Sequence, residues 1–282
     1  SEIINEISKS FIKNSKILNK LKPDIVLILG DRYELIPIAY PALLLNIPIA
    51  HLHGGEITQG AFDDSIRHSV SKMSNLHFVC NQIYRKRLIN MGEEPKNVHD
   101  VGGIGAELIS KEKKLKKKEV EKILNFRIDK KIILVSLHPE TKNKKVKYFS
   151  LFDALKKIKK NFIIIFTSPN SDPGSNKILK EITKFKKNKN CYYISNLGSE
   201  LYHSLLRLSN LLIGNSSSGL LEAPLLNVPS VNIGHRQKGR LIERSVLNCE
   251  FNKKEILKSI SIALKRKNKK NKIKHHKNKR AS

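Results

Sequence analysis

The chain has 282 residues, of which 28% are charged, and a formal net charge of +29 at pH 7. This length allows one large or two medium domains with their own apolar cores. The sequence has no apolar run of 18 residues and no signal-peptide pattern at its start, so we expect a cytoplasmic protein without a membrane span. Cys80, Cys191 and Cys249 lie far apart without metal-ligand spacing, which predicts reduced, buried thiols and no metal site.

The positive charge raises the question of nucleic-acid binding. Many basic residues are concentrated in residues 265–280, and others form lysine blocks such as the one at 111–122. No aromatic residues are interleaved with these blocks, as stacking on single strands would require. We therefore predict lysine-rich surface and a disordered tail at 265–282, and no nucleic-acid partner. Nucleic-acid binding that survived removal of everything after Leu264 would contradict this.

Short apolar runs alternate with helical patterns along most of the chain, which is typical of parallel α/β units. The first segment, residues 1–18, has a helical pattern. The predicted strands follow at 24–29, 47–52, 76–80, 131–137, 161–167, 191–195, 210–214 and 230–234. The lysine-rich segment separates two groups of strands. We predict two doubly wound Rossmann-like domains over residues 1–110 and 111–264.

The start of the first domain departs from the usual pattern. A doubly wound nucleotide-binding domain begins with a strand and a glycine turn, whereas residues 1–18 form a helical pattern. At roughly 30 residues per unit, two or three βα units look absent. We therefore expect the first domain to be incomplete.

Polar residues follow five of the predicted strands, where ligands of doubly wound sheets bind. They are Asp31, the segment from His53 to Glu56, His138, Asn170 with Asp172, and the run from Ser216 to Ser218. We predict that these strand ends meet at one cleft between the two domains.

Carboxylates dominate the first group of polar residues. Asp31 stands after a buried strand and a glycine, where it could transfer protons or cap the next helix. Glu56 follows Gly54 and Gly55, whose lack of side chains lets the backbone approach a ligand.

A predicted helix with a capped start follows at "DDSIRHSVSKM". Asp63 or Asp64 begins it, so these carboxylates and Glu56 could face Asp31. Arg67, on the next turn, would neutralise part of their charge or hold a substrate phosphate. His51 lies inside a strand and is interpreted as a core histidine.

The second group is suited to an anion. "GNSSSGLLEAP" follows a strand, so Ser216, Ser217, Ser218 and Gly219 would offer hydroxyl and N–H donors at a helix N-terminus, although a Ser-rich cap alone would look similar. Glu222, about one turn into that helix, could accept hydrogen bonds from ribose hydroxyls.

Further donors come from two other segments. His138, at a strand end before a proline, could serve catalysis, contact phosphate or cap a helix. Arg236, Lys238 and Arg240 supply cations, or form a surface loop.

These segments together resemble the hydrolysing UDP-N-acetylglucosamine 2-epimerases of the sialic and legionaminic acid branch. The resemblance covers about residues 22–246, and the motifs occur in order. They are "PDIVLILGDRYE", "IPIAHLHGGEITQGAFDDSIRHSVSKMSNLHFV", "TSPNSDPGS", "GNSSSGLLEAP" and "VNIGHRQKGR".

The resemblance implies a glycosyltransferase-B-like fold and a homodimer. It also implies a reaction without metal or nicotinamide, in which UDP leaves from C1 as a base removes the C2 proton, and water then adds to the glycal. The free sugar is inverted at C2. The substrate would be UDP-N-acetylglucosamine or the corresponding 2,4-diacetamido-2,4,6-trideoxy sugar.

By motif position, Asp31 matches the family's catalytic aspartate, and Asp63 or Asp64 matches its next acidic position. Some relatives carry glutamate at the position of His53, so that role passes to Glu56 or stays with the histidine. Other matches line the sugar nucleotide; they are Arg67, His138, Ser216, Glu222, Arg236 and Gln237.

Two points qualify the assignment. Relatives begin with a strand and a Gly-Thr-Arg turn that contacts the nucleotide, and nothing here matches it. We therefore expect this segment to be essential for activity; equal turnover by this chain and one extended at its N-terminus would contradict that. A UDP-sugar glycosyltransferase of the same fold is the alternative function.

Overall fold

The computed structural model describes residues 2–59, 61–141 and 146–266, which fold into two compact units. Unit 1 comprises residues 2–58 and 62–104, and unit 2 comprises residues 105–266 together with 59 and 61. The domain limits of 1–110 and 111–264 stay a prediction. The predicted tail at 265–282 lies outside the described residues from 267 onward. In the part of the chain that is described, no helix combines the length and hydropathy needed to cross a membrane.

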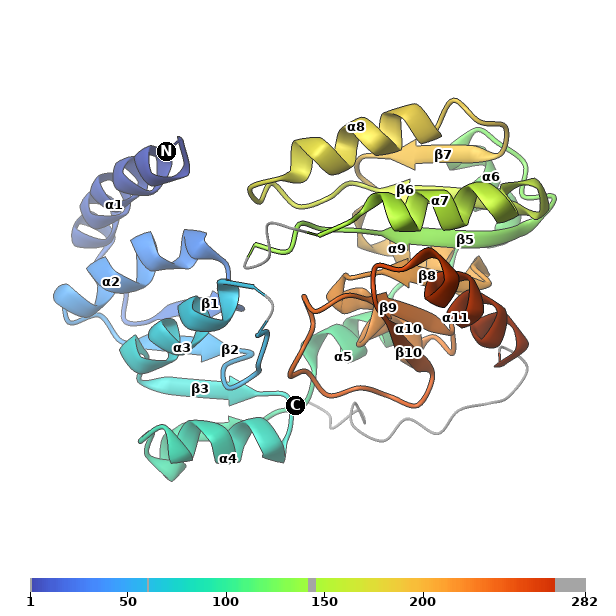
Figure 1. The fold of residues 1–282 in the computed structure, drawn as a ribbon. Coiled ribbons are helices and arrows are strands. Elements are labelled where there is room, and N and C mark those ends of the chain that lie inside the picture. Colours follow the sequence, from blue (N-terminus) through green and yellow to red (C-terminus); the bar gives the residue numbers. More distant parts are fainter. Residues whose placement is uncertain (1, 60, 142–145, 267–282) are drawn as a thin grey trace. The chain divides into compact units, whose positions relative to one another are not determined.

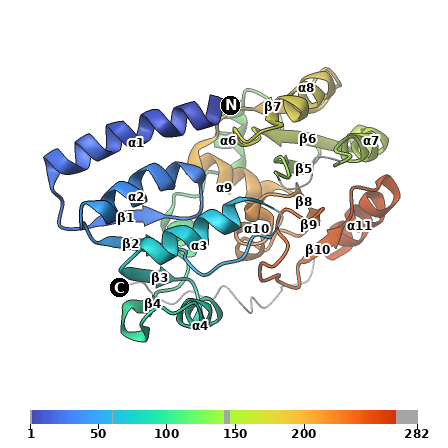
Figure 2. The same cartoon turned by 60° about the vertical axis from the view of Figure 1, so that its left-hand side comes forward.

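Unit 1 is built on a four-stranded parallel sheet in the order β1-β2-β3-β4. Figure 2 shows α1, α2 and α3 following one another beside this sheet. The strands are β1 (Val26–Leu29), β2 (Ile49–Leu52), β3 (Leu76–Val79) and β4 (Val98–Asp100). The helices are α1 (Glu2–Leu21), α2 (Ile36–Leu44), α3 (Asp63–Met73) and α4 (Gln82–Asn90), with 3-10 turns η1 (Tyr33–Leu35) and η2 (Pro95–Asn97).

The core of unit 1 lies between the sheet and the helices α1, α2 and α3. Ile28 of β1 and Ile49 of β2 pack with Leu18 of α1 and with apolar residues of α2 and α3. Successive strand residues point to opposite faces, and Leu27 and Leu29 remain 65% and 58% exposed. β1 is the edge strand of the described sheet.

Unit 2 is built on a six-stranded parallel sheet in the order β10-β9-β8-β5-β6-β7 (Figure 1). The strands are β5 (Lys131–Ser136), β6 (Phe162–Thr167), β7 (Cys191–Ile194), β8 (Leu211–Gly214), β9 (Ser230–Ile233) and β10 (Val246–Cys249). The helices are α5 (Ile104–Lys111), α6 (Lys117–Leu124), α7 (Phe149–Ile158), α8 (Ser175–Phe185), α9 (Gly198–Leu208), α10 (Glu222–Leu225) and α11 (Lys253–Arg266). Two further 3-10 turns are η3 (Lys159–Asn161) and η4 (Ser217–Gly219).

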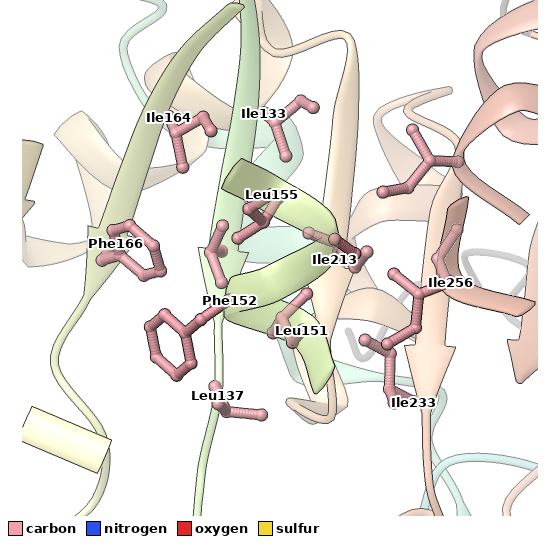
Figure 3. Close-up of a cluster of buried hydrophobic side chains, with 14 of the residues drawn as sticks. Ile133, Leu137, Leu151, Phe152, Leu155, Ile164, Phe166, Ile213, Ile233 and Ile256 are labelled. Atoms are coloured by element: carbon pink, nitrogen blue, oxygen red, sulfur yellow. The ribbon is translucent and has the colours of Figure 1, made fainter. Parts of the chain in front are cut away.

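The sheet of unit 2 has an apolar core on each face. Ile133 and Val135 of β5 pack with residues of α7, α8 and α11, a cluster drawn in Figure 3. Ile132 and Leu134, which alternate with them, pack with residues of α6, α9 and α10 on the other face. A strand buried on both faces needs apolar residues at consecutive positions, which is why β5 reads as a continuous apolar run. The predicted α/β class with parallel, doubly wound sheets is confirmed.

All eight predicted strands are present. β4 and β10 were not predicted. β4 has only three residues, two of them polar, and β10 has a polar residue within it, so neither produces an apolar run. β4 and β10 are edge strands of their sheets. An edge strand is less buried than a central strand, so it needs fewer apolar residues.

Candidate functional site

The ends of β1 and β2 place the first polar residues side by side. Leu29 pairs with Leu52, so Asp31 and His53 follow adjacent strands at the same edge of the sheet. The glycine between Leu29 and Asp31 adopts φ +91, a left-handed conformation that suits a residue without a side chain. Its carbonyl lies 2.8 Å from Nε2 of His51. The buried histidine thus fixes the turn that presents Asp31.

Arg67 connects the carboxylates of this region. Arg67 is 1% exposed, and its guanidinium donates through Nη2 to Oδ2 of Asp31 and through Nη1 to Oε2 of Glu56 at 3.4 Å. A third bond goes to the hydroxyl of Thr58 at 3.3 Å. Arg67 thus pairs with two of the carboxylates whose charge it was predicted to neutralise, and its alternative role in holding a phosphate stays a prediction. The N-cap residue of η1 is Arg32, the residue after Asp31.

The two aspartates of α3 differ in their surroundings. α3 begins at Asp63, as the sequence indicates, but the expected side-chain cap is wrong, because the N-cap is Phe62 and makes no such bond. Asp63 is 4% exposed. Asp64 accepts a 2.5 Å hydrogen bond from the backbone N–H of Thr58 and so holds the loop that follows Glu56.

His53, Glu56 and Cys80 form a second group beside these carboxylates. Nδ1 of His53 lies 2.9 Å from Oε1 of Glu56 and 2.8 Å from Sγ of Cys80. The Cys80 thiol lies 3.5 Å from Oε1 of Glu56. All three cysteines are free thiols as predicted, but Cys80 and Cys249 are only partly buried. The place of Cys80 was missed because sequence spacing does not show which strand ends are neighbours.

Burial controls the protonation of His51 beneath this group. Desolvation lowers the pKa of His51 to about 4, although its hydrogen bond to Gly30 opposes the shift. The ring is therefore neutral near pH 7, consistent with a structural histidine in the core. Nδ1 lies 3.1 Å from the hydroxyl of Ser71.

In unit 2, Asn215 joins the ends of β5 and β8. Its side chain accepts from the N–H of His138 at 2.7 Å and donates to the carbonyl of the same residue at 2.9 Å. Its carbonyl accepts from Gln237 at 2.9 Å and from Arg236 at 3.4 Å, which adds the segment after β9. The sequence analysis did not assign Asn215 a role, although it stands in the motif.

His138 is held in a defined orientation at the end of β5. It is 7% exposed, and its Nδ1 accepts from the backbone N–H of Asn170 at 3.0 Å. A neutral ring therefore carries its proton on Nε2, which lies 3.4 Å from the hydroxyl of Ser136. Asp172 follows Asn170 in the same loop and is 1% exposed. The structure thus brings the segments after β5 and β6 together.

The serine loop differs from the expected helix N-terminus. Ser217–Gly219 form the 3-10 turn η4, and Glu222 is the first residue of the four-residue helix α10. The N–H groups of Ser218, Gly219 and Leu220 are bonded within the turn. The prediction that the loop offers free N–H donors is therefore wrong for these three groups. The hydroxyl of Ser218 donates to Glu222 at 2.5 Å.

A partly buried network extends from Glu222 to α9. The hydroxyl of Tyr202 lies 2.5 Å from that of Ser218, and Nε2 of His203 lies 3.7 Å from Glu222. Nδ1 of His203 lies 2.5 Å from Glu112. Burial opposes protonation of His203, but the bonds and charges of both glutamates outweigh it and raise the pKa of His203. Neither His203 nor Glu112 belongs to a polar motif after a strand, so sequence analysis missed them.

The residues after β9 are oriented by a buried carboxylate. Arg236 and Gln237 are 7% and 1% exposed, whereas Arg240 is only partly buried. Oε1 of Glu140 accepts from the N–H groups of His235 and Arg236 at 2.9 and 3.2 Å. Burial raises the pKa of Glu140 despite these bonds. Arg236 is buried, so it does not belong to an exposed surface loop, which was the alternative interpretation.

The site residues thus fall into two sets. Unit 1 holds Asp31, His53, Glu56, Asp63, Asp64 and Arg67. Unit 2 holds His138, Asn170, Asp172, Ser216, Ser217, Ser218, Gly219, Glu222, Arg236, Gln237 and Arg240. That the two sets meet at one cleft stays a prediction.

Comparison with known proteins identifies relatives over nearly the whole chain. The family model described as "UDP-N-acetylglucosamine 2-epimerase" matches residues 1–280. The hydrolysing GDP/UDP-N,N'-diacetylbacillosamine 2-epimerase of Campylobacter jejuni is 44% identical over 89% of this chain and 66% of its own length. The polysialic acid biosynthesis protein P7 of Escherichia coli is 39% identical over 85% of this chain and 62% of its own. The chain therefore spans slightly less than two thirds of these relatives.

The fold is also similar to solved structures. The UDP-GlcNAc 2-epimerase of Methanocaldococcus jannaschii, crystallised with UDP-GlcNAc and UDP, superposes with a TM-score of 0.79 at 24% identity. The match covers 96% of this chain and 76% of that one. It supports the assignment of the glycosyltransferase-B-like fold.

Proposed function

Because this chain belongs to the UDP-N-acetylglucosamine 2-epimerase family, we propose that it carries out hydrolytic 2-epimerisation of a UDP-linked 2-acetamido sugar. The products are UDP and the free sugar inverted at C2. The substrate is UDP-N-acetylglucosamine or UDP-N,N'-diacetylbacillosamine, the 2,4-diacetamido-2,4,6-trideoxy sugar. The second sugar is favoured because a hydrolysing epimerase named for it is 44% identical.

The observation that carries the proposal is the group of carboxylates at the ends of β1 and β2. Elimination breaks the C2–H bond and the bond from C1 to the UDP oxygen, so a base must take the C2 proton. Water then adds its oxygen to C1 while a proton adds to the opposite face of C2. Asp31, Glu56 and Asp63 supply carboxylates for these transfers, and Arg67 balances part of their charge.

His53 completes the proton-transfer set, and Asp64 positions the loop beside it. His53 lies within hydrogen-bond distance of Glu56, so a proton can pass between them without a large rearrangement. Asp64 acts on the loop through Thr58. We assign the exchange at C2 to the Glu56–His53 pair and the neighbouring Asp31.

The UDP moiety belongs to unit 2 in this proposal. The hydroxyls of Ser216 and Ser217 donate to the diphosphate together with Arg236, Gln237 and Arg240, and Glu222 binds the ribose hydroxyls. Ser218 and Gly219 shape this loop through their bonds within the turn. His138, with its proton on Nε2, donates to the departing diphosphate, and Asn170 and Asp172 shape the loop around it. Stabilising the leaving group in this way lowers the barrier to elimination. No metal or other cofactor is required, and the active species is a homodimer.

The test is an acceptor-free reaction of this chain, and of one extended at its N-terminus, followed by NMR in D2O. We expect each turnover to release one UDP and one free mannosamine-type sugar carrying deuterium at C2. Both UDP-sugars are compared at equal concentration. Release of UDP only after addition of an acceptor would instead establish the glycosyltransferase alternative. UDP release with retained hydrogen and configuration at C2 would contradict epimerisation. Asp31→Asn and Glu56→Gln should each lower turnover by at least about 100-fold.

A further inference from the structure

We propose that His53, Glu56 and Cys80 form a binding site for one thiophilic divalent cation of the Zn²⁺ class, and that occupation of this site inhibits the enzyme. The three residues come from two strand ends at the same edge of the sheet of unit 1. His53 follows β2, Glu56 lies in the loop after it, and Cys80 follows β3. The inhibitory part of this inference rests on the proposed function.

The geometry of the donor atoms fits one small cation. One nitrogen, one sulfur and one oxygen lie within 4.8 Å of one another. The separations are 2.8 Å from N to S, 2.9 Å from N to O and 3.5 Å from S to O. Tetrahedral zinc with bonds of about 2.0–2.3 Å places its ligand atoms roughly 3.2–3.6 Å apart. Small outward rotations of His53 and Cys80 are therefore sufficient.

The donor types select for zinc. Thiolate and imidazole favour zinc over magnesium or calcium, which prefer oxygen ligands. Three protein ligands leave a fourth position for water. The side chain of His53 is 23% exposed and that of Glu56 is 5% exposed, so an ion can enter beside the histidine and reach a largely buried carboxylate.

The charges around the site favour a divalent cation. Glu56 uses its two oxygens differently, because Oε2 faces Arg67 while Oε1 faces His53 and Cys80. Arg67 is also paired with Asp31. With the Cys80 thiol ionised, Asp31, Glu56 and Cys80 carry three negative charges, and the Arg67 guanidinium carries one positive charge. The remaining two formal negative charges are those that Zn²⁺ neutralises.

Binding is an acid–base event without redox chemistry. The Cys80 thiol releases its proton to the buffer, and His53 coordinates through the Nδ1 lone pair with its proton on Nε2. Oε1 of Glu56 and Nδ1 of His53 are then both occupied. Neither can exchange a proton with C2 of the sugar, so the bound cation blocks the proposed reaction.

Binding is measured first and without reference to activity. All proteins carry His275→Ala and His276→Ala, because this adjacent pair could bind zinc by itself. Titration with Zn²⁺ should give one site per chain with proton release, and Co²⁺ should give a thiolate-to-cobalt absorption band. Cys80→Ser and His53→Asn should weaken binding by more than about tenfold. His53→Asn keeps a residue that tolerates the left-handed backbone at this position, φ +63.

Cys249→Ser is the matched control, because Cys249 is also a partly buried free thiol but lies in unit 2. It should bind Zn²⁺ and Co²⁺ as the parent does. Unchanged affinity in Cys80→Ser, or equal loss in Cys249→Ser, would overturn the site. Cys80→Ala and far-UV circular dichroism separate loss of the ligand from loss of the fold.

Inhibition is measured second, as the ratio of UDP release in EDTA to that in Zn²⁺ for each protein. The ratio should fall to about one in Cys80→Ser but not in Cys249→Ser. If zinc binds at Cys80 without changing the ratio, the inhibitory role is wrong while the site stands. If no protein releases UDP, even when extended at its N-terminus, the proposed function fails while the binding result still decides the site.

Discussion

Arg67 of α3 forms an ion pair with Asp31, which stands 36 residues earlier in the chain, just after β1. The same guanidinium bonds to Glu56 in the loop after β2. One buried cation thus fixes the positions of two carboxylates from different segments. Removing a partner from a buried charge pair costs more than the pair itself contributes, because the remaining charge is left without compensation.

Arg67→Ala should therefore lower the free energy of unfolding by about 3–5 kcal/mol, as measured by urea denaturation. Arg32→Ala is the control, because Arg32 pairs with Glu34 on the surface, where such a pair contributes less than about 1 kcal/mol. Equal losses of unfolding free energy in both variants would show that the buried ion pairs of Arg67 contribute no more than the surface pair of Arg32.

His51 should make the fold less stable in acid. Burial lowers the pKa of His51 to about 4, so between pH 6.5 and 4 the unfolded chain binds a proton that the folded chain does not. Stability contributed by the neutral ring is complete above pH 6.5 and is lost as the pH falls, by up to about 3 kcal/mol. The difference between wild type and His51→Gln, measured by denaturation from pH 7.5 to 4, should shrink towards low pH. A constant difference would contradict this.

His203 should have the opposite pH dependence. Its pKa is raised by Glu222 and Glu112 against the effect of burial, so the folded state holds the proton more tightly than the unfolded state. The stabilisation is complete below pH 6.5 and is lost as the pH rises through the raised pKa. Wild type should lose stability relative to His203→Gln as the pH rises above 6.5. Parallel pH profiles of the melting temperature for the two proteins would exclude a charged His203.

Gly214→Ala should severely destabilise unit 2. At Gly214, which ends β8, an added Cβ would lie 1.8 Å from the carbonyl oxygen of Ser136, and φ is +144. Backbone displacement at this point should cost at least about 3 kcal/mol. Gly105→Ala is the matched control, since nothing lies within 4 Å of its added Cβ inside α5. It should leave stability unchanged or raise it by up to about 1 kcal/mol.

The parallel sheets were predictable because strands buried on both faces require apolar runs, as in β5 and β6. The same reasoning failed for β4 and β10, which are short and contain polar residues. The helix expected after "GNSSSG" is a 3-10 turn followed by one short helix, because Ser216 and Ser218 bond locally and compete with regular helix geometry.

The candidate site was predictable where residues follow strands, as Asp31, His53 and His138 do. It was not predictable where contacts depend on which strands are neighbours. Cys80 meets His53 only because β3 pairs with β2, and His203 meets Glu222 only because α9 lies against the serine loop. Neither of these contacts can be inferred from the spacing of the residues in the sequence.

The two hydrogen bonds between Asn215 and His138 continue the β5–β8 ladder beyond the last paired residues, with a side chain in place of backbone. Two more bonds to the carbonyl of Asn215 attach the segment after β9. The conformational entropy of this part of the loop is therefore lost during folding rather than during ligand binding. A ligand that binds beside it meets a preorganised surface, and more of its interaction energy is available as affinity.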